Sequence, residues 1–445
     1  MNRTYLKFAL LLTALILPAL SIAQPAPAPM PMPMPAPAPM PKFALPPLLP
    51  EVPATVGDVK IDGKKINTAV AKEYKNMLAS ISQQFARIPA QSHGAAKKYF
   101  QGQIDKMPYS YLKGEVFLKL QSQYIKRNKI TCTDKEYADF VATIKTRLPQ
   151  GMTLETALKE QGMSLADFRD FVAWETYAKV QLSPEKAKAF IKANPTYFDG
   201  TKRSSSHILI ACDALAATTI QKAIIAQLAK IGADIEAKKT TFGAEAAKYS
   251  VCPSGVTAKG SLGDIVCLGA QNRMVPTFSY GTFQCKLGGV ITPIRTNFGF
   301  HLIQAGKEIP APTAAAPDKA QAAAAEQTNI QSAQQLLGTL LQNKIFDQAL
   351  GSCPIAYAPT VQAKMDKDAA EKQKQADQMR TMAKARAAAE AKAKAIEAIA
   401  EAEAKAVKDA EAKKLVETLK KAEAKDATKA APEAAAKAAE APAKK

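Results

Sequence analysis

Two low-complexity segments bracket the part of this chain that can fold around a core. Residues 24–53 are dominated by Pro, Ala and Met, and residues 361–445 are almost entirely Ala, Lys and Glu. Alternating prolines favour an extended polyproline II conformation, which predicts a stiff Pro-rich spacer over residues 24–53. A docking ligand for a proline-reading domain is the alternative. A hydrophobic core is therefore expected within residues 54–360.

The C-terminal tail, residues 361–445, carries 20 basic and 15 acidic residues, a net charge of +5. Ala, Lys and Glu are strong helix formers, and no proline interrupts them before Pro432. Large apolar side chains are too sparse for a sustained coiled-coil seam. We expect a long solvated helix that frays toward disorder. Reach across the cell envelope, or binding to the wall, is the functional alternative.

The first residues have the pattern of a secretory signal peptide. Basic residues precede an apolar run, 8–20, and small residues at Ser21 and Ala23 follow it. A transmembrane anchor needs about 20 apolar residues, and this run is shorter and contains Pro18. We predict that residues 1–23 are a signal peptide, and that the mature chain has no transmembrane segment. The protein is then exported, to a periplasm or the cell envelope.

Cysteines are compatible with an oxidising compartment, where disulfides can persist. Six of them allow fifteen pairings, among which the sequence cannot choose. No CxxC pair and no Cys/His cluster has metal-binding spacing, so we predict no metal site and no other cofactor. The six residues are Cys132, Cys212, Cys252, Cys267, Cys285 and Cys353.

The formal net charge of the whole chain is +20. A basic surface can attract nucleic acid, an anionic membrane surface or acidic wall polymers. Because no basic motif is interleaved with aromatic residues, nucleic acid is not an expected partner. We interpret the charge as an aid to solubility, with weak attraction to anionic envelope surfaces.

Residues 54–200 are predicted to be mostly helical. Three helix starts carry capping signals, at Thr133, Ser164 and Ser183. His93 lies in a polar stretch and is expected to be an exposed loop residue. The expected elements are a strand and turn at 59–64, then helices at 67–89, 96–128, 134–147, 153–160, 164–181 and 184–193.

Residues 201–308 differ in character and predict a small α+β domain. Short β-rich runs alternate with helical segments, and His207 and His301 both lie in strands among apolar neighbours. An Ala/Pro-rich linker, 309–327, is expected next. The expected strands are 206–210, 289–294 and 300–303, the helices 214–231, 241–249 and 275–285, with a further helix at 328–349 and a strand at 354–358.

The middle domain also contains short motifs whose order and spacing extend over residues 203–308. They are Ser206–Ile210, Phe242–Ser250, Cys252–Gly255, Lys259–Gly263, Met274–Phe278, Gly288–Ile291 and Thr296–Ile303. Together they resemble a parvulin-type peptidyl-prolyl cis/trans isomerase domain. The resemblance covers the whole of the α+β domain and implies its fold.

The resemblance also implies a site. The paired histidines of the family fall on His207 and His301, and its polar residue facing the substrate falls on Cys252. Its proline pocket falls on Leu262, Met274, Phe278 and Phe283. Such a site needs no nucleophile: the X-Pro barrier is about 18–20 kcal/mol, and it falls if the twisted amide is bound better than the planar forms.

Some positions depart from the family pattern. The loop at Lys259–Ile265 lacks the Asp and both aromatic residues that many relatives carry, which implies reduced activity. Cys252 could pair with Cys212, Cys267 or Cys285 in an oxidising compartment and would then not be a free polar group. The stretch 211–215 lacks the basic cluster of phosphate-requiring relatives, so no phosphate requirement is expected.

The flanking segments resemble extracytoplasmic foldases of the SurA and PrsA type. In that arrangement residues 54–200, completed by 326–360, form one chaperone module. The expected fold class is α+β: a parvulin-like domain, a mostly helical chaperone module and a long helical or disordered tail. The implied function is isomerase and chaperone for unfolded exported polypeptides with X-Pro bonds. The alternatives are a catalytically weak holdase and an envelope scaffold tethered by the basic tail.

Overall fold

The computed structural model describes residues 41–85, 87–160, 163–266, 274–311 and 319–437. The predicted signal peptide, most of the predicted spacer and Cys267 lie outside these ranges. The described residues form two compact units, which divide between Asp377 and Gln378.

The first half of unit 1 is a helical module with a short strand pair at its start. Capping signals at Thr133, Ser164 and Ser183 are confirmed, because each side-chain hydroxyl accepts a hydrogen bond from the backbone of the following turn. The elements are β1 (Ala54–Val56), β2 (Val59–Lys60), α2 (Gly63–Phe85), η1 (Ala90–Ser92), α3 (His93–Arg127), α4 (Asp134–Lys145), α5 (Leu154–Glu160), α6 (Leu165–Gln181), α7 (Pro184–Ala193) and α8 (Pro195–Phe198).

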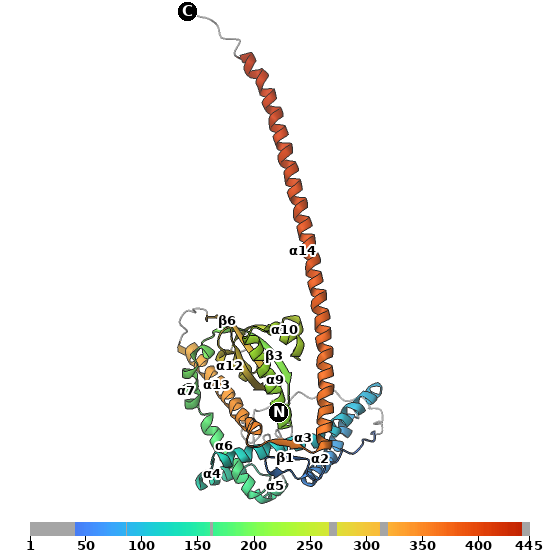
Figure 1. The fold of residues 1–445 in the computed structure, drawn as a ribbon, viewed down its shortest axis with the longest axis vertical. Helices are drawn as coiled ribbons and strands as arrows, with labels where there is room; N and C mark the ends of the chain where they lie inside the picture. The colour runs from blue at the N-terminus through green and yellow to red at the C-terminus, as the bar shows by residue number, and fades with distance from the viewer. Residues whose placement is uncertain (1–40, 86, 161–162, 267–273, 312–318, 438–445) are drawn as a thin grey trace, which may run out of the picture. The chain divides into compact units, whose positions relative to one another are not determined.

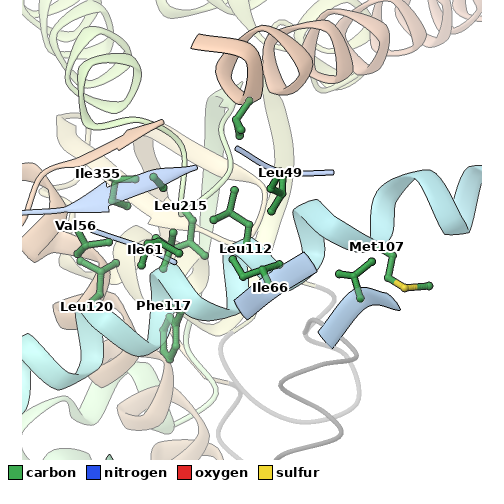
Figure 2. Close-up of a cluster of buried hydrophobic side chains, with 14 of the residues drawn as sticks. Leu49, Val56, Ile61, Ile66, Met107, Leu112, Phe117, Leu120, Leu215 and Ile355 are labelled. Carbon is green, nitrogen blue, oxygen red and sulfur yellow. The ribbon is translucent and has the colours of Figure 1, made fainter. Parts of the chain in front are cut away.

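The chain returns to this module after the middle domain, through α13 (Lys319–Asp347), η2 (Gln348–Leu350) and β7 (Ile355–Tyr357). Strand β7 pairs antiparallel with β1 and completes a three-stranded sheet of order β2-β1-β7. Ile355 then packs into one buried cluster with side chains of α2 and α3, such as Ile66 and Leu112 (Figure 2). Each such apolar side chain contributes about 1.5–3 kcal/mol when fully buried.

The middle domain is an antiparallel four-stranded sheet of order β4-β3-β6-β5. Helices α9, α10 and α12 surround it (Figure 1). The predicted α+β class is therefore confirmed. Its elements are β3 (Lys202–Ala211), α9 (Thr218–Glu236), α10 (Phe242–Tyr249), α11 (Ser254–Thr257), β4 (Ser261–Val266), α12 (Pro276–Gln284), β5 (Val290–Thr296) and β6 (Gly299–Ile309).

Polar contacts join the middle domain to the helical module. Thr218 Oγ1 donates to the Ala349 carbonyl at 2.6 Å and accepts from the Ile355 N–H at 2.8 Å. Nearby, the buried Arg295 side chain, in β5, pairs with Asp347 at the end of α13, with 3.1 Å between Nε and Oδ1. These contacts fix the end of α13 against the sheet domain.

Several expectations need correction. Residues 261–266 form an edge strand, β4, where a loop was expected. Helix α13 begins at Lys319, inside the predicted 309–327 linker. His93 opens α3 and is half-buried, with Nε2 2.8 Å from the Ile88 carbonyl. Residues 41–53, the end of the predicted spacer, pack on the helical module through Leu49, which is 5% exposed.

The tail forms α14 (Pro359–Lys437), an uninterrupted helix whose large apolar side chains from Met379 onward are exposed, as expected for a solvated helix. Charged pairs four residues apart, such as Arg386 with Glu390, lie along it. Such pairs support an isolated helix. Nowhere in the described ranges does a helix combine the length and the apolar character needed to cross a membrane.

Candidate active site

The two strand histidines lie on one face of the sheet because side chains alternate along a strand. In β3 and β6, Ile208 and Leu302 point toward the apolar cluster under α9 and α10. The intervening His207 and His301 therefore point to the opposite face, toward α12. Register places Leu209 opposite His301, which makes the histidines diagonal neighbours on that face.

The histidines form one buried pair with a partner for every ring nitrogen. Their Nδ1 atoms lie 3.1 Å apart. Nε2 of His301 lies 2.8 Å from Thr296 Oγ1, and Nε2 of His207 lies 3.3 Å from Ser254 Oγ. The Ser254 hydroxyl in turn donates to Cys252 Sγ at 3.2 Å. A continuous chain of polar contacts thus runs from Thr296 to Cys252.

If every group in this network donates its proton in the same direction, from Thr296 toward Cys252, each hydrogen bond has one donor and one acceptor. Thr296 Oγ1 already accepts the Phe298 N–H at 3.1 Å, so its own proton can be donated to Nε2 of His301. We therefore assign the proton of His301 to Nδ1 and that of His207 to Nε2, which donates to Ser254. The thiol sulfur of Cys252 is then the final acceptor of the network.

Both histidines are neutral in the folded protein. Burial lowers the pKa of His207 to about 4. Burial, together with the neighbouring His207, lowers the pKa of His301 to about 3. The ordinary value is about 6.5, so neither ring is charged at neutral pH. The pair can orient hydrogen bonds, since a neutral imidazole offers one donor and one acceptor.

Helix α12 covers the pair. The Phe278 ring meets both imidazoles edge-on, with centroids 5.4 Å from His207 and 5.1 Å from His301. A side chain at Gly281 would bring Cβ to within 2.7 Å of Ile294 Cδ1, so the glycine allows α12 to lie close to the sheet. Phe278, which the sequence placed in the proline pocket, is itself buried at 2% exposure and packs against the histidine pair.

The predicted site residues do not all come together. Cys252 is half-buried at the accessible end of the network, and Leu262 and Met274 are half-buried in β4 and before α12. Phe283 lies away from the histidine network: it is buried on another side of α12, 5.5 Å from the Tyr197 ring by centroids. We therefore remove Phe283 from the candidate pocket.

Three residues that support the candidate site were missed from the sequence. Thr296 and Ser254 complete the histidine network, but a threonine near a turn and a serine beside a proline carry no distinguishing signal. Arg203 orders the end of α12, where Nη1 donates to the Phe283 carbonyl at 2.7 Å and the Cys285 carbonyl at 3.1 Å. An arginine at a strand start does not predict a helix-capping role.

The described cysteines are all free thiols: Cys132, Cys212, Cys252, Cys285 and Cys353. Burial raises the pKa of the Cys212 thiol to about 11 and also raises that of Cys285. Of the pairings considered for Cys252, the one with Cys267 concerns a residue outside the described ranges. In this structure Cys252 is free to accept from Ser254.

The same part of the chain matches a known family. Residues 207–307 match the family model described as Rotamase: PPIC-type PPIASE domain. The middle of this chain is a PPIC-type rotamase domain. The matched range begins at the first histidine of the pair and includes the second, so the family pattern and the buried network coincide.

Two curated relatives match this chain over part of its length. A foldase protein PrsA of Staphylococcus epidermidis is 30% identical over 157 residues, 35% of this chain and 46% of the relative. The chain thus covers about half of that relative's length. A foldase protein PrsA of Caldanaerobacter subterraneus is 24% identical over 255 residues, 56% of this chain and 74% of the relative.

Among solved structures, the peptidylprolyl isomerase PrsA from Bacillus anthracis is 17% identical. The comparison covers 54% of this chain and 96% of that one, with a TM-score of 0.23.

Proposed function

We propose that the rotamase domain catalyses cis/trans isomerisation of X-Pro bonds in unfolded, exported polypeptides, while the helical module holds the client. The observation that carries this proposal is the buried neutral pair of His207 and His301, continued through Ser254 to the half-buried Cys252. Only the Cys252 end of this network is accessible enough to face a bound peptide.

The chemistry needs orientation more than proton transfer. Isomerisation breaks no covalent bond; it requires the amide to lose its planarity against a barrier of about 18–20 kcal/mol. A site that binds the twisted amide more tightly than either planar form lowers that barrier. The neutral pair would hold Ser254 and Cys252 in fixed orientations toward the substrate backbone. Leu262 and Met274 would contact the apolar proline ring.

A second role as a holdase is favoured by the size of the helical module. Its core combines residues from α2, α3 and β7, so the module is a packed element of the fold and not a linker. The foldase names of the relatives support this role. We also place the protein outside the cytoplasm, with the basic tail making weak contacts to anionic envelope polymers.

The test is prolyl isomerase activity of the mature full-length chain on a panel of short X-Pro peptides. Phe278→Leu should lower kcat/KM at least tenfold, because that ring supports both imidazoles. Phe283→Leu is the matched control on the same helix, and should leave kcat/KM within twofold because its side chain packs toward Tyr197.

Reductant should not change the activity, because Cys252 is a free thiol here. Equal effects of the two substitutions would refute the assigned site. A folded protein without turnover on any peptide would refute the isomerase and leave a holdase.

A further inference from the structure

The segment 41–50 behaves as a bound peptide on the helical module. It has no regular secondary structure, yet between residues 42 and 49 its burial repeats every third residue: Phe43 and Pro46 are half-buried and Leu49 is buried, while the terminal Pro41 and Pro50 are half-buried as well. Three residues per turn is the repeat of a polyproline II helix. One side of this proline-containing segment therefore faces α2 and α3, and the other sides face solvent.

Two side-chain amides hold the backbone of this segment. Asn67, in α2, accepts from the Leu49 N–H and donates to the Leu49 carbonyl, both at 2.9 Å. Gln101, in α3, accepts from the Ala44 N–H at 2.9 Å and donates to the Ala44 carbonyl at 3.3 Å. Each pair of hydrogen bonds holds only main-chain atoms, so it tolerates different side chains in the peptide.

Apolar contacts accompany these backbone contacts. The Phe43 ring meets Phe100 of α3 edge-on, with 6.4 Å between centroids. Leu49 joins the buried cluster shown in Figure 2, at 5% exposure. By contrast, Leu45 and Leu48 are 76% and 80% exposed. The segment thus presents apolar side chains at three-residue spacing to the helices, and its remaining leucines to solvent.

Main-chain pairing does not account for the position of the segment. Within the described part of the chain, no backbone-to-backbone hydrogen bond involves residues 41–50. The first such bond comes at Glu51, whose carbonyl accepts from the Gly63 N–H at 2.8 Å. Residues 41–50 therefore depend on side-chain amides and apolar contacts, as a bound peptide does, and Glu51 fixes their C-terminal end.

The Tyr74 hydroxyl, in α2, also donates to the Phe43 carbonyl at 3.4 Å. We propose that the α2–α3 surface, defined by Asn67, Tyr74, Phe100 and Gln101, is a binding site for extended, proline-containing apolar polypeptides. The chain's own residues 41–50 occupy it in cis, and a client displaces them. This inference rests on the proposed chaperone function and names the site and the class of ligand. Because a tethered segment has an effective concentration in the millimolar range, the site is largely closed to weak ligands until its occupant is released.

The test is binding of a fluorescein-labelled peptide with the sequence of residues 41–51 to the mature full-length chain, followed by fluorescence anisotropy. The release variant, Phe43→Ser with Leu49→Ser, weakens the occupant and leaves the surface intact. It should bind the peptide at least tenfold more tightly than wild type. The matched control, Leu45→Ser with Leu48→Ser, changes only exposed leucines of the same segment and should bind as wild type does.

Adding Asn67→Ala and Gln101→Ala to the release variant should reverse the gain at least tenfold, because the main-chain hydrogen bonds are lost. A folded release variant that binds no more tightly than wild type would overturn the proposal. So would equal binding after the amide substitutions, since the peptide would then lie elsewhere.

Hydrogen exchange on the wild-type chain keeps the test independent of any variant. When residues 41–50 occupy the surface, the Leu49 N–H donates to Asn67 Oδ1. Excess unlabelled peptide should displace the segment and remove the exchange protection of this N–H. Unchanged protection at saturating peptide would also overturn the proposal. Isomerase turnover is measured separately: its absence would refute the enzyme, while the peptide titration would still decide this site.

Discussion

The rotamase domain should lose stability at mildly acidic pH, because two histidines are buried in the neutral form. In the unfolded chain each histidine binds a proton below about pH 6.5. In the fold, His207 and His301 bind protons only near pH 4 and pH 3. Stability is therefore complete above pH 6.5, falls as the pH is lowered, and stops falling only near the folded-state values.

The magnitude follows from the size of the shifts. One pH unit corresponds to about 1.4 kcal/mol for each proton. At pH 5.0, about 1.5 units below the unfolded-state value, each histidine lowers the unfolding free energy by about 2 kcal/mol, and the pair by about 4 kcal/mol. Since whole domains are stable by about 5–15 kcal/mol, the loss should be decisive.

Urea unfolding between pH 7.5 and 5.0, followed by hydrogen exchange in β3 and β6 peptides, would isolate this domain from the other cores. For the wild type, the slope of the unfolding free energy against pH should correspond to nearly two protons taken up on unfolding. His301→Gln should reduce this slope to about one proton. Leu302→Ala, on the opposite face of the same strand, should cost about 3 kcal/mol at every pH without changing the slope. Equal slopes for wild type and His301→Gln would refute the reasoning.

Three further substitutions, one of them a control, test local structure by chemical denaturation. Arg203→Met should lower stability by about 3 kcal/mol, because it leaves Glu308 and the carbonyls at the end of α12 without their partner. Lys188→Met, at an exposed ion pair, should change stability by less than about 0.5 kcal/mol; similar losses for both would contradict the assigned role. Thr133→Ala should cost about 1 kcal/mol by removing a helix cap, and no loss of α4 protection in hydrogen exchange would contradict it.

Helices with capping signals were predictable because their starts depend on neighbouring residues. The α7 start at Ser183 and Pro184 was predicted at its observed position. Strand β4 was missed because Gly260 and Gly263 are typical of a loop sequence. In the structure both glycines adopt positive φ. Its strand character comes from pairing with β3, a contact that no local pattern announces.

The candidate site was predictable where alternation decides the geometry and not where helix rotation does. His207 and His301 lie in strands, where successive side chains alternate between the two faces of the sheet, so the face of each histidine follows once the strand is assigned. Phe278 and Phe283 lie five residues apart on α12, which turns them about 140° from each other around the axis. One meets the histidines and the other meets Tyr197. Composition alone cannot separate two phenylalanines of one helix.

The position of residues 41–50 could not be predicted from composition either. A Pro-rich segment cannot form ladder hydrogen bonds at its prolines, which favours a solvated spacer when only the sequence is considered. Here side-chain amides replace the ladder, and they come from Asn67 and Gln101, 18 and 57 residues away from the positions they bind. A single asparagine and a single glutamine on helices have no periodic signature. The same property that hides this contact in the sequence, recognition of the backbone by side-chain amides, is what would let the surface accept other extended polypeptides.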